Sequence, residues 1–356
     1  MIFFTDPTTD TDATAPLFTA AGLNRYLASS TPRPRLLSRS EYTALTPAQK
    51  EDYDLARTQF LSGGVLVNTR QLAKAKKDIV SLHNENAGRN GDNRGLMFSG
   101  KATLGKTTTA KALMRFVHTM YVKQFPDYAG NNRYPVVYIS VPTGCTPKLL
   151  MVAFAKFFGL TTGRTEDADS IKSRVIDTLR AGGTQLVVID ELQNLAAANR
   201  GNGESIDVLK LVHDHVRATF VYAGLNLSKS PLFTGDKGDQ LRGRFSTTEL
   251  TRFNLTNPEH LNDWGGIIKQ FEDALPLADH QSGTLVPMAQ YLHDRTNGSL
   301  GSLARLLTGT AIGLISDPSD PREMLSRKVL DDYTLDDSAE NHYRSVRAMT
   351  TKSKAA

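Results

Sequence analysis

Residues 100–107 form a loop pattern that binds phosphate. The stretch reads GKATLGKT, which satisfies G-x-x-x-x-G-K-[ST], and it lies between a short apolar run and a segment with helical periodicity. The glycines let the backbone curl so that successive N–H groups face a phosphate, and the N-terminus of the following helix adds its positive end. Nucleotide contacts are therefore expected at Gly100, Lys101, Ala102, Thr103, Leu104, Gly105, Lys106, Thr107 and Thr108.

Two side chains of this loop carry further chemistry. Lys106 is expected to bridge the β- and γ-phosphates, and Thr107 is expected to hold Mg²⁺. The sequence therefore predicts ATP and Mg²⁺ as cofactors.

An acidic pair downstream supplies the second half of a hydrolytic site. The stretch LVVIDELQNL places Asp190 at the end of an apolar run, where it can hold the Mg²⁺ shell, and Glu191 beside it, where it can polarise an attacking water. Parallel α/β sheets place their ligands at the carboxyl ends of strands, so a solvated surface pair is a poorer explanation. The pair favours hydrolysis of ATP over binding alone.

The elements that must position these residues alternate along the chain. Short apolar runs occur at 95–100, 135–141, 184–190 and 218–224, with a fifth candidate strand at 247–255, and helix-length segments separate them. Runs that are apolar on both faces suit a parallel sheet covered by helices on both sides, so the predicted fold class is α/β. Helices are also expected at 45–63, at 68–88 and from 257 to about 335.

Composition shifts divide the chain into five parts. We expect a mostly irregular, exposed N-terminal arm at 1–35, a helical segment at 36–92, a phosphate-loop core at 93–256, a small all-helical domain at 257–335 and a basic, mobile tail at 336–356.

Overall composition excludes several classes of protein. The 356 residues are 40% hydrophobic and carry a formal net charge of +5, which suits a sizeable core and leans towards a polyanionic partner. The single cysteine, Cys145, excludes an intrachain disulfide, and its expected role is that of a small buried thiol. His213 and His215 lie two apart on a helix and point away from each other, so they predict no metal site. No signal-peptide pattern or membrane-spanning run occurs, and the expected location is cytoplasmic.

The order of the two motifs resembles the AAA+ class of ATPases, which have a sheet of strand order 5-1-4-3-2 and a helical lid domain. This resemblance implies a polar sensor after the fourth strand, where the chain offers Asn226. It implies an arginine before the fifth strand that reaches a neighbouring subunit's γ-phosphate, for which Arg244 and Arg242 are the candidates. It also implies a lid arginine, which Arg305 supplies four residues after Gly301. An alternative stays open for each: Arg242 and Arg244 are equally explained as surface charge, and Arg305 as a snorkelling side chain.

Within that class the chain resembles the TniB/TnsC family of transposition regulators, relatives of the Mu B protein. The similarity runs from about Arg35 to Asp332 and includes VPTGCTPKLLMVAFAKFFGL, DELQNL and YAGLNLSKSPLFTGDKGDQLRGRF. It departs at Leu225, where the family commonly has a small polar residue.

The resemblance implies a function that the motifs alone do not. Members of the family bind ATP, oligomerise on duplex DNA as rings or helical filaments, and recruit or activate a transposase, in some cases with a target-selection adaptor; hydrolysis then disassembles the polymer. DNA contacts are expected after the second strand at Thr143, Thr146 and Lys148, although Thr146-Pro147 is equally a common helix start. The basic tail offers a further contact or an ordinary solvated terminus, through Arg344, Arg347, Lys352 and Lys354.

Two alternatives of other classes stay open. One is a signalling or defence ATPase that oligomerises on sensing a ligand, although the chain has little spare length for a sensor or effector domain. The other is a small-molecule P-loop kinase, against which the Asp190-Glu191 pair favours water as the phosphoryl acceptor.

Overall fold

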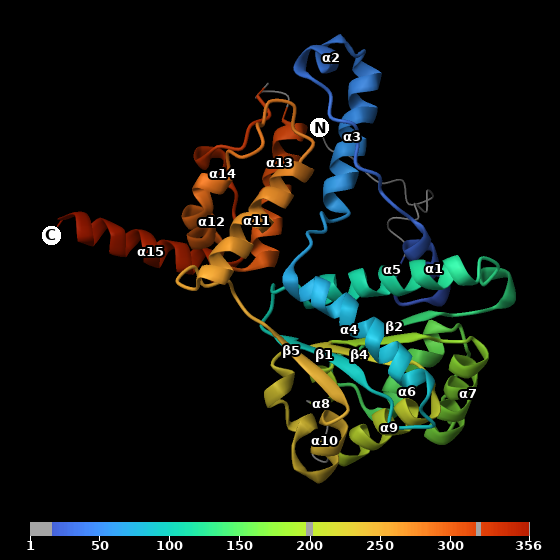
Figure 1. Ribbon diagram of the computed structural model, residues 1–356. Helices are drawn as coiled ribbons and strands as arrows, with labels where there is room; N and C mark the ends of the chain where they lie inside the picture. Colours follow the sequence, from blue (N-terminus) through green and yellow to red (C-terminus); the bar gives the residue numbers. More distant parts are fainter. Residues whose placement is uncertain (1–15, 197–201, 318–321, 356) are drawn as a thin grey trace. The chain divides into compact units, whose positions relative to one another are not determined.

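The computed structural model describes residues 16–196, 202–317 and 322–355, drawn in Figure 1. These residues divide into two compact units. The first, which we call the sheet unit, takes residues 71–250 and the preceding segment up to Ser30. The second, the helical unit, takes residues 31–70 and 251–355. Over residues 16–355 the chain therefore passes from one unit to the other after Ser30, after Arg70 and after Leu250.

The sheet unit is built on five parallel strands. Their spatial order is β2-β3-β4-β1-β5, and they span Val136–Ser140, Leu186–Asp190, Thr219–Gly224, Gly95–Gly100 and Phe245–Leu250 in that order. Read from the other edge, this order is 5-1-4-3-2, so the predicted AAA+ arrangement is confirmed. The fifth strand begins and ends earlier than expected, because Phe245 pairs with Gly95 and Leu250 pairs with Gly100.

The central strands are buried on both faces because helices cover both sides of the sheet. Every residue of β1, β3 and β4 is buried. The face seen uppermost in Figure 1 is covered by α1 (Ala20–Ala28), α4 (Arg70–Ala87) and α5 (Lys106–Gln124). The opposite face carries α6 (Pro147–Phe157), α7 (Ala168–Ala181), α8 (Gln193–Ala196), α9 (Asn202–His215) and α10 (Gly235–Arg242).

The helical unit has a core of its own. Its members are α2 (Arg39–Ala44), α3 (Pro47–Ser62), α11 (Pro258–Ala274), α12 (Ala289–Thr296), α13 (Leu300–Ser316), α14 (Arg327–Asp332) and α15 (Asp337–Ala355). Helix α3 begins with a capping box between Thr46 and Gln49, and it packs on α13. Trp264, Leu303 and Leu61 are among the buried side chains of this core.

Two segments differ from the expected irregular ends. Part of the predicted exposed arm forms α1, whose N-terminus is capped by the Thr19 hydroxyl and whose Leu23 and Leu27 are buried. Most of the predicted mobile tail forms α15, which buries Ala339 and Tyr343 and packs on α12. Helix α1 was missed because it is a nine-residue helix within an arm rich in Thr, Asp and Pro, and α15 was missed because its polar composition hides a small number of apolar residues at helical spacing.

Among the described residues, no single helix is both long and apolar enough to cross a membrane. The segments Val286–Thr296 and Leu300–Ser316 pass that test only as a pair, and they are bent by 112° relative to each other.

Candidate nucleotide site

The phosphate loop joins the end of β1 to the start of α5. Thr103 and Gly105 both have left-handed backbone conformations, with φ of 63° and 90°, which turn the loop back towards the helix. At Gly100 a Cβ would lie 2.6 Å from the carbonyl oxygen of Leu250, so a side chain there would collide with β5. The loop therefore needs glycine at both of its motif positions, once for close approach and once for conformation.

Lys106 lies inside the loop and is 7% exposed. Its Nζ donates hydrogen bonds to the carbonyl oxygens of Gly100 at 3.0 Å and Lys101 at 2.7 Å. Burial lowers the pKa of the ammonium group, while the carboxylates of Glu191 and Asp190 act to raise it. The geometry holds a positive charge in the hollow of the loop, where a polyphosphate needs one.

The predicted magnesium ligands lie side by side. Thr107 Oγ1 donates to Asp190 Oδ2 at 2.8 Å, across the sheet from α5 to the end of β3. Tyr138 OH donates to the same oxygen at 3.2 Å, while Asp190 Oδ1 accepts from the backbone N–H of Glu191. Burial raises the pKa of Tyr138, and the Asp190 charge adds to that effect, so the phenol stays a donor.

This donor set suits Mg²⁺. A hydroxyl and a carboxylate oxygen are both hard ligands, and Mg²⁺ takes few protein ligands and completes its shell with water and phosphate oxygens. Among the described residues there is no cluster of three or more His, Cys, Asp or Glu side chains that could hold a metal without such help.

Glu191 follows β3 in an unusual backbone conformation. Its φ is 57°, which is strained for a residue with a side chain, and its carboxylate is half-buried. The side-chain amide of Gln193 donates to Glu191 Oε2, and Gln193 Oε1 accepts the backbone N–H of Leu225 at 2.9 Å. Gln193 was not among the residues predicted from the sequence; the available signal was an amide two residues after the glutamate.

The candidate sensor and finger residues lie in the sheet unit but are held differently. Asn226 is exposed and left-handed, with φ of 47°. Arg244 forms ion pairs of 2.5 Å with both Asp92 and Asp214. Arg242, at the end of α10, is exposed and has no ion pair or hydrogen bond of its side chain within the described residues.

Both arginines lie near the N-terminal ends of the strands, whereas the phosphate loop lies at the C-terminal ends. The carbonyl oxygen of Arg244 accepts the N–H of Gly95, the first residue of β1, whereas the loop follows Gly100, the last. Five residue steps of strand separate these points by about 16 Å. Neither arginine can therefore serve the phosphate loop of its own chain.

The three expected DNA residues lie in and just after the loop that follows β2. Thr143 is exposed. Thr146 is the N-cap of α6 and accepts the N–H of Leu149, and Lys148 donates to the carbonyl oxygen of Glu166 at 2.6 Å. Cys145 between them is fully buried, and burial raises the pKa of its thiol to about 11.

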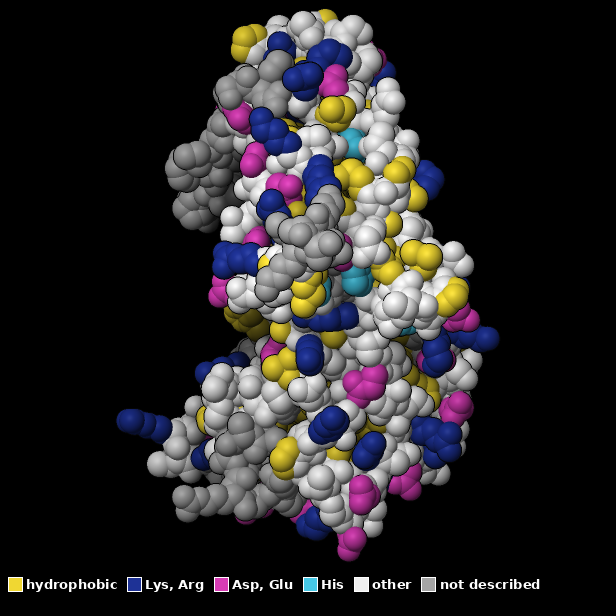
Figure 2. All heavy atoms as spheres, turned by 90° about the vertical axis from the view of Figure 1, so that its left-hand side faces the viewer, with side chains coloured by type: hydrophobic (Ala, Val, Ile, Leu, Met, Phe, Trp, Pro, Cys, Tyr) yellow, Lys and Arg dark blue, Asp and Glu magenta, His cyan; other side chains and the backbone are white. Residues whose placement is uncertain are grey.

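The remaining predictions concern the helical unit and the surface charge. Arg305 is exposed on α13, and Arg344 is exposed on α15. On the face drawn in Figure 2, Lys and Arg side chains are interspersed with Asp and Glu, so the excess positive charge is not gathered into one patch there.

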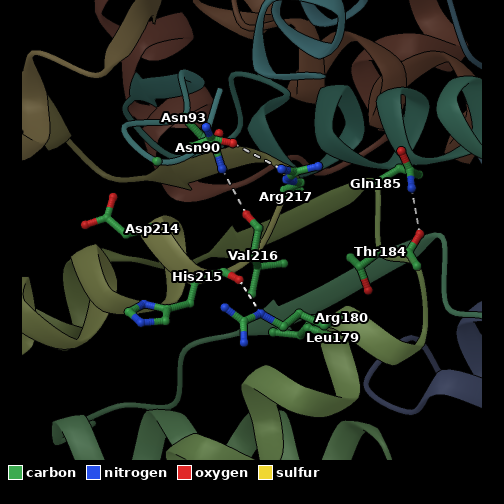
Figure 3. A pocket seen from close by; sticks show the side chains of 12 residues that line it. Asn90, Asn93, Leu179, Arg180, Thr184, Gln185, Asp214, His215, Val216 and Arg217 are labelled. Carbon is green, nitrogen blue, oxygen red and sulfur yellow. Dashed lines mark hydrogen bonds between the residues drawn. The ribbon is translucent and has the colours of Figure 1, made fainter. Parts of the chain in front are cut away.

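A cavity lies at the N-terminal ends of the strands, opposite to the phosphate loop (Figure 3). This cavity of about 390 Å³ has Arg180 and Arg217 at its rim. Arg180 Nε already donates to the carbonyl oxygen of His215 at 2.6 Å, and Arg217 donates to Asn90 Oδ1 at 3.1 Å. None of the predicted nucleotide residues lines it, so it is separate from the nucleotide site.

Comparisons with known proteins agree with this geometry. A sequence model described as "Bacterial TniB protein" matches residues 57–255. A search of curated proteins found no match. Among solved structures, the chain is similar to the ORC2 protein of Aeropyrum pernix (ADPNP-ADP complexes), with 17% identity, a TM-score of 0.53, and coverage of 73% of this chain and 65% of that one.

A further similar structure is the A. pernix ORC1 protein in complex with DNA, with 17% identity, a TM-score of 0.54, and coverage of 77% of this chain and 65% of that one. The chain thus spans just under two thirds of the length of both structures, and at this identity the likeness is one of fold.

Proposed function

The chain belongs to the TniB family, and from this premise we propose that it is an ATPase that assembles on duplex DNA, recruits or activates a transposase there, and is released by hydrolysis of ATP. The observation that carries the proposal is the arrangement at the ends of β1 and β3. There the phosphate loop presents the Lys106 ammonium, Thr107 of the loop bonds to Asp190, and Glu191 follows directly.

Each of these residues has a part in the reaction. The loop N–H groups and Lys106 bind and orient the β- and γ-phosphates. Thr107 and Asp190 would hold Mg²⁺, which when bound supplies positive charge to the phosphate oxygens. Glu191 accepts a proton from a water whose oxygen forms a bond to the γ-phosphorus, while the bond from that phosphorus to the bridging oxygen breaks and leaves ADP.

Each chain supplies only half of the proposed hydrolytic site, and a neighbouring subunit supplies the other half. Since neither Arg242 nor Arg244 can reach its own phosphate loop, a finger arginine has to act on a second copy of the chain. Arg244 is occupied by Asp92 and Asp214, whereas Arg242 is exposed, so we assign the finger to Arg242. ATP then stabilises contacts between subunits, and its hydrolysis weakens them.

DNA contact is assigned to the loop after β2. Thr143 is exposed, and the partner of the Lys148 ammonium group is a neutral carbonyl oxygen and not a carboxylate. Contacts of this kind bind phosphates without reading bases, which suits a protein that marks a target for a transposase.

Sedimentation with duplex DNA tests the proposal. Purified protein is mixed with DNA of two unrelated sequences and with ATP, ADP or a non-hydrolysable ATP analogue. We expect assembly on both DNAs with ATP and with the analogue, and none with ADP. Assembly that requires nucleotide but is the same with and without DNA would instead support an oligomerising signalling ATPase. If DNA has no effect under any of the three nucleotide conditions, the proposal is wrong.

A further inference from the structure

Gln193 is the side chain that links the glutamate after β3 to the end of β4. It is the first residue of α8, and both ends of its amide are engaged. The amide nitrogen donates to the carboxylate of Glu191, and the amide oxygen accepts the N–H of Leu225 at 2.9 Å. The amide therefore has one orientation, because exchanging its oxygen and nitrogen would lose both bonds.

The end of β4 is shaped to admit this amide. A Cβ placed on Gly224 would lie 2.5 Å from Gln193 Oε1, so any larger residue at that position would displace the amide. The backbone adds a second connection, because the N–H of Leu192 donates to the carbonyl oxygen of Ala223 at 3.1 Å. The loop that carries Glu191 is thus connected to the end of β4 by the backbone of Leu192 and by the side chain of Gln193.

No other polar side chain of the described residues has this role. The position after Gly224 is occupied by Leu225, whose side chain cannot donate, and Asn226 is exposed with a left-handed backbone. Within the described part of the chain, Gln193 is the one side chain that donates to the Glu191 carboxylate.

We propose that Gln193 is a positioning residue that fixes the orientation of the Glu191 carboxylate for ATP hydrolysis. One Glu191 oxygen is held by the amide, which leaves the other to accept the proton of the attacking water. A donor fixed at both ends removes rotamer freedom from a half-buried carboxylate before substrate binds. This inference rests on the proposed role of Glu191 in hydrolysis.

The test is Gln193→Glu, which has the same shape and still accepts the Leu225 N–H but cannot donate to Glu191. We expect kcat for ATP hydrolysis to fall at least about 10-fold, while the Kd for the non-hydrolysable ATP analogue changes less than about twofold. Asn194→Asp is the matched control, because it adds the same charge one residue away, where the side chain bonds to the carbonyl oxygen of Val141. Its kcat should stay within about threefold of wild type.

Three results would overturn the proposal: an unchanged kcat in Gln193→Glu, a parallel loss of analogue binding, or an equal loss of kcat in Asn194→Asp. The double variant Glu191→Gln with Gln193→Glu separates the two proposals. If Gln193 acts through Glu191, the double variant is no slower than Glu191→Gln alone. Normal turnover in Glu191→Gln alone would remove the role of Glu191 itself, whereas a slow Glu191→Gln with a normal Gln193→Glu would remove only that of Gln193.

Discussion

At the scale of single residues, the nucleotide site keeps its reactive groups in fixed hydrogen bonds. Asp190 accepts from Thr107, from Tyr138 and from a backbone N–H, and Lys106 donates to two loop carbonyl groups. The motif spacing predicted that Thr107 and Asp190 act together, because a phosphate loop and an acidic strand end have a fixed relation in a parallel sheet. Tyr138 was not predicted. Gln193 could not be predicted in the same way, because its partner Leu225, which follows β4, is 32 residues away in the chain.

His213 makes the stability of the sheet unit depend on pH. Its ring is fully buried against Phe220 and Phe245, neither ring nitrogen has a hydrogen-bond partner, and burial, with a smaller effect from Arg244, lowers its pKa from 6.5 to about 3. The unfolded chain takes up this proton below pH 6.5 and the folded chain does not. Stability is therefore complete above pH 6.5 and is lost as the pH falls, by about 1.4 kcal/mol for each unit down to about pH 3.

Urea unfolding followed by circular dichroism between pH 7.5 and 5 measures this effect. His213→Phe keeps an aromatic ring and cannot be protonated, so its free energy of unfolding should fall less steeply with acid than that of wild type. Equal slopes for the two proteins would show that His213 does not control the pH dependence.

At the scale of elements, the sequence predicted the central strands closely and the ends of the chain poorly. Runs such as LVVID are apolar on both faces, which is typical of buried parallel strands in an α/β protein. The predicted bounds of these central strands therefore matched the observed bounds within two residues. Helix α1 is short and α15 has few apolar residues, and Leu23, Leu27 and Tyr343 of these helices are buried against neighbouring elements. Such tertiary packing cannot be read from local composition.

Helix α3 is joined to the helical unit by a buried charge network. Arg57 is fully buried and donates to Asp54, to Glu323 and to the carbonyl oxygen of Pro276. Removing the guanidinium leaves the Glu323 carboxylate, 6% exposed, without its partner. We expect Arg57→Ala to lower the free energy of unfolding by about 3–5 kcal/mol.

Trp264 reports this change, because the single tryptophan of the chain is buried in the core of the same unit. The control is Arg35→Ala, which removes a surface pair with Glu41 and should cost less than about 1 kcal/mol. Similar losses for the two variants in fluorescence-monitored urea unfolding would contradict the role given to Arg57.

At the scale of the whole molecule, the two proposed half-sites lie at opposite ends of the strands. The phosphate loop follows the last residue of β1, and Arg242 precedes β5, which begins beside the first residue of β1. Strands about 16 Å long separate them within a chain, so the proposed function requires that they combine between copies.

Mixing two inactive variants tests this arrangement. Glu191→Gln lacks the base but keeps the finger, and Arg242→Ala lacks the finger but keeps the base. On DNA with ATP, each alone should hydrolyse slowly, whereas an equimolar mixture should recover a measurable part of wild-type turnover because some interfaces combine both intact halves. A mixture no faster than its components, with both variants assembled on the DNA, would place the finger elsewhere.

The claim that joins all three scales is that hydrolysis controls how long the assembly stays on DNA. It is measured most directly by loading the protein on fluorescent duplex DNA with ATP and following release after dilution, for wild type and for Glu191→Gln. We expect wild type to leave the DNA as ATP is consumed, while Glu191→Gln stays bound to the DNA for at least about 10 times longer. Release of both proteins at the same rate would contradict it.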